Sequence, residues 1–168
     1  MAEEKKIGAI KEELQAAEDS MLPDFIARYE KDERSGVKSL VEKAGKRIQK
    51  LEAEYARIEN LKKYEKEYAD AGYICGIDEV GRGPLAGPVV AGAVILPKDC
   101  DILYINDSKK LSASMREKLY DEIMEKAVAT GIGMAGPGRI DEINILQATY
   151  EAMRQAITNL KVKPDILL

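Results

Sequence analysis

The segment from Tyr73 to Leu96 constrains the fold of this chain more than any other part of the sequence. It reads YICGIDEVGRGPLAGPVVAGAVIL, in which two apolar runs are separated by a turn rich in glycine and proline. Runs with β-branched residues that are bounded by Gly and Pro are typical of β-strands. The segment therefore predicts a strand, a turn and a second strand.

Two adjacent carboxylates, Asp78 and Glu79, follow the first apolar run. Side chains alternate between the two faces of a strand, so these carboxylates are expected to point to opposite sides unless a bulge intervenes. One of them then lies at the end of a buried strand, where an unpaired charge is costly. A bound cation or a basic partner would offset that cost. The alternative interpretation is an ordinary solvated strand end.

The turn carries one cation between two glycines, Gly81-Arg82-Gly83. Gly81 and Gly83 permit positive φ and a close approach of ligand to backbone, and successive N–H groups in such a turn can bind an anion. Arg82 adds a forked donor suited to phosphate. Carboxylates for a hard metal beside donors for phosphate indicate metal-assisted phosphodiester chemistry. A nucleotide-binding phosphate loop is disfavoured, because a Gly-Lys-Ser/Thr ending and a following helix are absent.

Composition excludes several classes of function. The 168 residues include no histidine, which removes His-based triads and imidazole-dependent zinc sites. The net charge of −4 means that any contact with nucleic acid must use a local patch. Cys75 and Cys100 lack metal-ligand spacing, and no signal peptide or membrane span is recognisable. We expect a cytoplasmic protein with free thiols and no membrane partner.

Residues 1–72 predict a charged helical module. Apolar residues recur at helical spacing in residues 4–17, and a break at Asp19-Ser20 precedes a short helix near Pro23. A turn at residues 32–36, with Ser35 as a cap, leads to a long helix of about residues 36–70. Its heptad stripe is expected to be covered by the earlier helices in a hairpin, and the alternative is pairing with a second chain. Lysines and an arginine cluster in residues 38–50, as either a phosphate-binding face or a solvated surface.

Residues 97–168 predict a loop, a helix from Ser112 to Ala127, a strand from Ala129 to Ala135 and a helix that reaches about Leu160. Small residues on the last helix imply close packing on a sheet. Pro164 to Leu168 indicates the start of another buried strand. On spacing alone Asp107 and Ser112 are helix caps, and Asn144 and Gln147 either face a substrate or serve as caps or surface polar groups.

Three segments, in this order, together resemble one protein family. GIDEVGRGPLAGPVVAGAVIL is similar to the N-terminal signature of bacterial ribonuclease HII, and residues 106–112 (NDSKKLS) and 140–148 (IDEINILQA) also match it. The sister ribonuclease HIII family usually carries Thr where Arg82 stands. The resemblance implies an α/β fold: an N-terminal helical extension (1–72) and then the first part of a ribonuclease H-like mixed sheet flanked by helices (73–168).

The resemblance also implies an activity and its site. The family is a metal-dependent endonuclease that cleaves the RNA strand of RNA–DNA hybrids and single ribonucleotides embedded in duplex DNA. By this resemblance Asp78 and Glu79 would bind Mg²⁺ or Mn²⁺, with Asp78 bridging two ions. Gly81, Arg82 and Gly83 would grip the backbone around the ribonucleotide, and Ser108, Lys109 and Lys110 would lie near the bound nucleic acid. We expect a monomer.

The sequence departs from the family pattern after Leu168. In ribonuclease HII a third catalytic aspartate normally follows the Pro-Asp-x-Leu-Leu strand, and a fourth acidic ligand and a tyrosine come later. Asp99, Asp101 and Asp121 do not occupy matching positions. We therefore expect a catalytic domain that is incomplete at its C-terminus, with little or no activity by itself. The alternative function is a non-catalytic fragment that binds nucleic acid or another protein.

Overall fold

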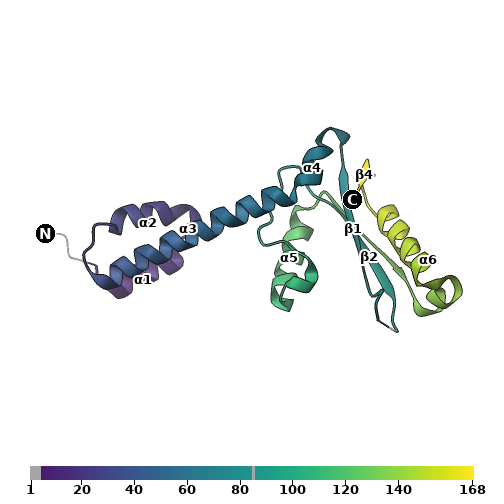
Figure 1. The fold of residues 1–168 in the computed structure, drawn as a ribbon, viewed down its shortest axis with the longest axis horizontal. Helices are drawn as coiled ribbons and strands as arrows, with labels where there is room; N and C mark the ends of the chain where they lie inside the picture. Colours follow the sequence, from purple (N-terminus) through teal and green to yellow (C-terminus); the bar gives the residue numbers. More distant parts are fainter. Residues whose placement is uncertain (1–4, 85) are drawn as a thin grey trace. The chain divides into compact units, whose positions relative to one another are not determined.

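The computed structural model of the protein describes residues 5–84 and 86–168. Contacts divide the chain into two compact units, one ending at Glu59 and the other beginning at Asn60. Figure 1 shows helices alone in the first unit and a sheet with helices in the second. The sequence-based boundary near Gly72 stays a prediction. None of the described helices combines the length and the apolar composition that crossing a bilayer requires.

The N-terminal unit is a helical hairpin with its own hydrophobic core. It contains α1 (Ile7–Ala16), the 3-10 turn η1 (Asp19–Met21), α2 (Leu22–Tyr29) and most of α3 (Ser35–Leu61). Helices α1 and α2 bury apolar side chains against the first half of α3, which confirms the predicted covering of its stripe. The core residues are Ile10, Leu22, Phe25, Tyr29, Val37, Leu40 and Ala44. Ser35, expected as a cap, is instead the first residue of α3.

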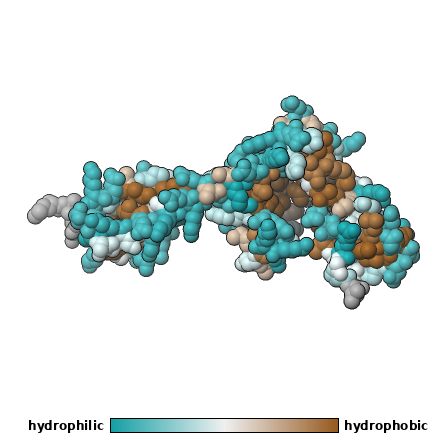
Figure 2. Space-filling model, in the orientation of Figure 1, coloured by the Kyte–Doolittle hydropathy of each residue, from teal (hydrophilic) through white to brown (hydrophobic). Residues whose placement is uncertain are grey.

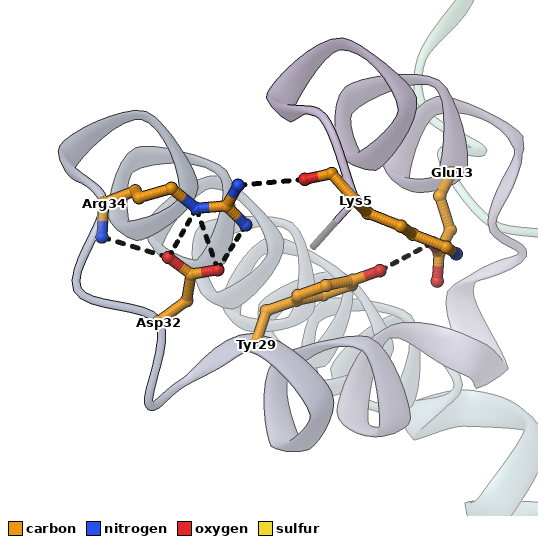
Figure 3. Close-up of polar contacts among 5 residues, drawn as sticks. All are labelled: Lys5, Glu13, Tyr29, Asp32 and Arg34. Carbon is orange, nitrogen blue, oxygen red and sulfur yellow. Dashed lines mark hydrogen bonds and ion pairs between the residues drawn. The ribbon is translucent and has the colours of Figure 1, made fainter. Parts of the chain in front are cut away.

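Polar contacts join the start of the chain to α1, α2 and the turn between α2 and α3 (Figure 3). Glu13 of α1 accepts hydrogen bonds from Lys5 Nζ (2.7 Å) and from the hydroxyl of Tyr29 (2.8 Å). The hydrogen bond from Lys5 lowers the pKa of Glu13 below its ordinary value. Arg34 binds both carboxylate oxygens of Asp32 and donates to the backbone oxygen of Lys5 (2.9 Å). These contacts fix the turn between α2 and α3 against the start of the chain.

The long helix is shorter than its sequence predicted. Helix α3 ends at Leu61, and α4 (Lys63–Glu67) and the 3-10 turn η2 (Ala69–Ala71) take the place of its expected continuation to Asp70. Lys62 leaves the helical region with a ψ of 18°. Leu61 and Tyr64 are exposed, so no apolar core supports a continued helix. Lys62 pairs with Asp101 (3.1 Å), which holds this segment to the loop after β2.

The second unit is built on a mixed four-stranded sheet in the order β3-β2-β1-β4. Strands β1 (Ile74–Val80), β2 (Val89–Ile95) and β3 (Ala129–Ala135) pair antiparallel, and β4 (Ile166–Leu167) pairs parallel to β1. The predicted strand, turn and strand over Tyr73 to Leu96 are therefore confirmed. With helices α5 (Ala113–Lys126) and α6 (Pro137–Thr158), the α/β fold class is confirmed as well.

Helix α6 covers one face of the sheet at close range. Its buried Ala148, Ala152 and Ala156 pack on β2 and β3, as their small size predicted. A Cβ at Gly133 would lie 2.0 Å from the carbonyl oxygen of Ala152, and one at Gly131 would lie 2.1 Å from that of Ala156. Only glycine at these two strand positions lets the helix backbone approach so closely.

Strand β3 forms an edge of the described sheet, and α6 satisfies its outward backbone groups. The N–H of Met134 donates to Gln155 Oε1 (3.1 Å), and Asn159 Nδ2 donates to the carbonyl oxygen of Ile132 (2.8 Å). Gln155 and Asn159 lie one helical turn apart, so both amides face the strand. Their hydrogen bonds occupy two outward backbone groups of β3 and thereby protect this edge from pairing with another strand.

Strand β4 differs from its prediction in burial. A strand forms after Pro164 as expected, but Leu167 is half exposed and lies at the other edge of the described sheet. An edge strand pairs with one neighbour, here β1, and its other edge has no paired strand in the described sheet. Asp165 anchors this strand, because its carboxylate accepts from the N–H of Tyr73 (2.8 Å) and its own N–H donates to the carbonyl oxygen of Tyr73 (2.8 Å).

Candidate functional site

Asp78 lies near the end of β1 on the sheet face opposite α6. Its cross-strand partner is Gly92, and Gly76 precedes it by two residues on the same face. A Cβ at either glycine would meet no atom of the described residues within 4 Å. The carboxylate therefore stands above open backbone, where a ligand has room to approach. Asp78 Oδ1 accepts a hydrogen bond from the N–H of Glu79 (2.8 Å), which fixes the side chain close to its own strand.

Glu79 points to the other face of β1, as the alternation of strand side chains predicted. The burial pattern alternates along β1, and the register with β2 continues to Val80, so no bulge intervenes. The Glu79 side chain is 21% exposed, and its Oε1 lies 3.4 Å from Nη1 of Arg82, which is half exposed. This contact joins the strand end to the turn. At 3.4 Å and on the surface it is a weak ion pair.

The turn after β1 depends on Gly81. Its φ is +88°, and a Cβ there would lie 2.3 Å from the carbonyl oxygen of Pro88. Gly87 also has a positive φ of +115°. Gly83 does not have a positive φ, and a Cβ there would meet no atom of the described residues within 4 Å. Gly81 closes the turn, whereas Gly83 leaves the backbone accessible. Leu85 lies outside the described residues.

Ser108, Lys109 and Lys110 form a separate exposed element, the 3-10 turn η3. Asp107 caps it by accepting from the N–H of Lys109 (3.0 Å), and Ser112 caps α5 by accepting from the N–H of Met115 (3.3 Å). Both predicted caps are confirmed. Among the described residues, no hydrogen bond or ion pair links η3 to Asp78 or Glu79, so any joint action depends on a ligand that spans both.

Asn144 is a cap inside α6. Its φ of 67° interrupts the helix, and its Oδ1 accepts from the N–H groups of Leu146 (3.0 Å) and Gln147 (3.1 Å). The two hydrogen bonds offset a backbone conformation that is unfavourable for a residue with a Cβ. Of the two interpretations left open by the sequence, the cap describes Asn144. Gln147 remains on the exposed surface.

The donor chemistry of the site fits a hard divalent cation. Carboxylate oxygens suit Mg²⁺ and Mn²⁺, and Mg²⁺ is commonly held by one or two carboxylates together with substrate phosphates and water. Within residues 5–84 and 86–168 there is no cluster of three or more potential metal ligands. Asp78, on the open face, is the carboxylate best placed to meet a metal and a phosphate. Glu79 diverges from it and is engaged with Arg82.

Sequence reasoning missed the surroundings of Asp78. Register places Gly92 beside it and Ile132 beyond, and puts Val90 and Met134 level with Val80. On this face Val80 is 68%, Ile132 62% and Met134 57% exposed. Figure 2 shows brown hydrophobic areas on the visible surface of the unit that contains the sheet. This apolar face with glycines beneath Asp78 becomes apparent only from the pairing of the three strands, because it combines residues of β1, β2 and β3 that are far apart in the sequence.

Comparisons with known proteins address the whole described chain. The family model of the ribonuclease HII N-terminal domain matches residues 6–69, and that of ribonuclease HII matches residues 75–168. The chain is 61% identical over 163 residues to ribonuclease HII of Lachnoclostridium phytofermentans, a match that covers 97% of this chain and 64% of that protein. It is 50% identical over 170 residues to ribonuclease HII of Enterococcus faecalis, covering 100% and 66%.

Solved structures give a partial match. The ribonuclease H2 from Pyrococcus horikoshii is 29% identical, with a TM-score of 0.45 over 56% of this chain and 48% of that one. The chain spans about two thirds of the length of the Lachnoclostridium and Enterococcus proteins. The two family models cover nearly all of it, and the three sequence segments that resemble the family all lie within the second match. The chain therefore belongs to the ribonuclease HII family.

Proposed function

We propose that this chain carries part of the active site of an endoribonuclease that cleaves the RNA strand of RNA–DNA hybrids and single ribonucleotides embedded in duplex DNA. One observation carries the proposal. Within the segment that matches the family, Asp78 lies on an exposed face of the sheet, next to Gly76 and Gly92 and close in sequence to the turn that contains Arg82. The Lachnoclostridium and Enterococcus relatives are ribonuclease HII proteins, which supports the same reaction class.

Each residue has a proposed role. A bound Mg²⁺ or Mn²⁺ would act as a Lewis acid that stabilises phosphate charge and activates a water for attack. Asp78 would hold the cation against the sheet, and Glu79 would orient the site from the strand end. Arg82 would exchange its weak contact with Glu79 for a substrate phosphate. The accessible backbone at Gly83 would approach the sugar, where the 2′-hydroxyl distinguishes ribose from deoxyribose.

The second candidate function is nucleic-acid binding without catalysis. It is favoured by the finding that the described residues hold no cluster of three potential metal ligands. Lys109 and Lys110 on η3 and Arg82 on the turn are exposed and would still contact phosphates. In that case the chain would bind hybrid and ribonucleotide-containing duplexes, and the addition of metal would produce no cleavage.

A cleavage assay tests the two candidates. The substrate is a labelled DNA duplex with one embedded ribonucleotide, incubated with Mg²⁺, Mn²⁺ or EDTA. We expect little or no cutting by the 168-residue chain. The same chain extended by the part of the Lachnoclostridium relative that lies outside the match should cut at the ribonucleotide, only with metal, and should leave an all-DNA duplex intact. If the folded extended chain binds the duplex but does not cut it with either metal, the nuclease assignment is wrong.

Arg82→Ala tests the phosphate role of the turn. Loss of one phosphate contact should weaken duplex binding and reduce the slope of log K against log[salt] by about 0.9. Stability should be unchanged, because the contact with Glu79 is long and half exposed. Arg154→Ala is the matched control, since Arg154 is exposed on α6 and has no side-chain ion pair among the described residues. Equal slopes for both variants would remove Arg82 from the phosphate site.

A further inference from the structure

The outward face of α3 carries a regular row of positive charge. The apolar residues Val37, Val41, Ala44 and Ile48 face α1 and α2. Two positions after each of them stand Ser39, Lys43, Lys46 and Lys50. A shift of two residues is a rotation of about 200° around a helix, so this second row lies opposite the hairpin core. We call Lys43, Lys46 and Lys50 the basic stripe.

The basic stripe is exposed and little neutralised. All three side chains are solvent-exposed, and Figure 2 shows mainly hydrophilic surface over the helical unit. Among the described residues Lys43 and Lys50 have no ion-pair partner. Lys46 pairs with Glu42 at 2.6 Å, but both side chains are about two-thirds exposed, so that pair is weak. Glu42 is the one acidic residue from Ser39 to Lys50.

Two acidic residues of the same unit form contacts away from the stripe: Glu13 of α1 binds Lys5, Arg28 and Tyr29, and Asp32 binds Arg34 in the turn after α2. Asp19 pairs with Arg47 of α3, beside the stripe. Acidic residues slightly outnumber basic ones in residues 1–72 as a whole, but only Glu42 lies between Ser39 and Lys50. The stripe therefore presents a local positive field that the net charge of the unit conceals.

We propose that the basic stripe is a second nucleic-acid contact, which binds the phosphate backbone of the duplex independently of base sequence and of sugar type. This inference rests on the proposed function. From Lys43 to Lys50 the stripe spans about 10.5 Å of helix axis, and a duplex strand presents a phosphate about every 3.4 Å of its axis. The stripe therefore covers about three phosphate steps of one strand, a length over which each of its three ammonium groups can contact a phosphate.

The composition of the stripe disfavours a membrane surface as its partner. An interfacial helix needs an apolar face to insert beside its cations. The apolar face of α3 is already packed against Ile10, Leu22 and Phe25 of the hairpin, and the stripe itself contains no apolar side chain. An acidic protein surface would satisfy the same charges, and the experiment below distinguishes it from a duplex.

The test compares two triple variants of the full 168-residue chain with equal charge changes. The first replaces Lys43, Lys46 and Lys50 by Gln, and the control replaces Lys6, Lys11 and Lys31. The control lysines are also exposed and lack ion pairs among the described residues. Binding is measured from 50 to 300 mM salt to an all-DNA duplex and to the same duplex with one ribonucleotide. Thermal unfolding verifies that both variants fold.

The stripe variant should lose about tenfold or more in affinity for both duplexes at 100 mM salt, and its log–log salt slope should fall by about 2.7 relative to wild type, three contacts at about 0.9 each. The control should shift much less. Equal affinities and slopes for the two variants overturn the proposal, and this is the result expected if the stripe serves an acidic protein. If the stripe proposal is overturned but the extended chain still cleaves at the ribonucleotide, the proposed function stands. If the extended chain neither binds the duplex nor cleaves it, both the stripe proposal and the proposed function are refuted.

Discussion

Asp78→Asn is expected to abolish metal-dependent cleavage by the extended chain, with a loss of about 10³-fold or more, equivalent to about 4 kcal/mol of transition-state stabilisation. The reason is local. Among the described residues of strands β1, β2 and β3 on the open sheet face, Asp78 is the one that carries an acidic group. An amide oxygen is a much weaker ligand for a hard cation than a carboxylate. The measurement is the single-turnover rate on the duplex with one embedded ribonucleotide.

The fold should tolerate this substitution. Asn keeps an Oδ1 that can accept the hydrogen bond from the N–H of Glu79, now 2.8 Å long. The melting temperature and the duplex affinity should therefore remain close to wild type. Asp121→Asn is the matched control, because Asp121 is an exposed aspartate of α5 in the same unit. Normal turnover in Asp78→Asn, or an equal loss in Asp121→Asn, would refute the metal-ligand role.

Most of the fold could be predicted from the positions of glycine and proline and from the spacing of apolar residues. The strand-turn-strand over Tyr73 to Leu96 and the strand from Ala129 to Ala135 form as predicted, because their apolar runs are short and sharply bounded. The alanine row of α6 predicted close packing, which follows from the small volume of the side chains themselves. Caps were also readable, since Asp107 and Ser112 act on backbone groups only two or three residues away.

Features that depend on distant parts of the chain could not be read in the same way. The end of α3 at Leu61 has no local signal, because the sequence there contains no Gly or Pro. It coincides with the ion pair between Lys62 and the distant Asp101. Gly81 and Gly83 are the same residue type in the same turn but differ in backbone conformation. Of the two, only Gly81 lies against the carbonyl group of Pro88. The glycines around Asp78 could be predicted only from the strand register. The hydrogen bonds of Gln155 and Asn159 to the edge of β3 could be predicted only from the docking of α6 on the sheet.

Gly133→Ala is expected to destabilise the second unit by about 3 kcal/mol or more, the upper range for overpacking. The added Cβ would lie 2.0 Å from the carbonyl oxygen of Ala152 and 2.6 Å from the nitrogen of Ala156. Both atoms belong to the backbone of α6, so no side-chain rotation can relieve the clash. The helix would have to move off the sheet and uncover Val89 and Ala91, which it now helps to bury. Urea denaturation followed by circular dichroism gives the free energy of unfolding.

Gly92→Ala provides the matched control for this prediction. Gly92 lies in the adjacent strand β2 and pairs with Ile132, so its environment in the sheet is comparable, but it faces away from α6. A Cβ there meets no atom within 4 Å. Alanine should be neutral or stabilising by about 0.5–1 kcal/mol, because glycine loses more conformational freedom on folding. Equal unfolding free energies for the two variants would mean that α6 does not dock as closely as described. In that case α6 would not cover one face of the sheet, and Asp78 could no longer be assigned to the single exposed face.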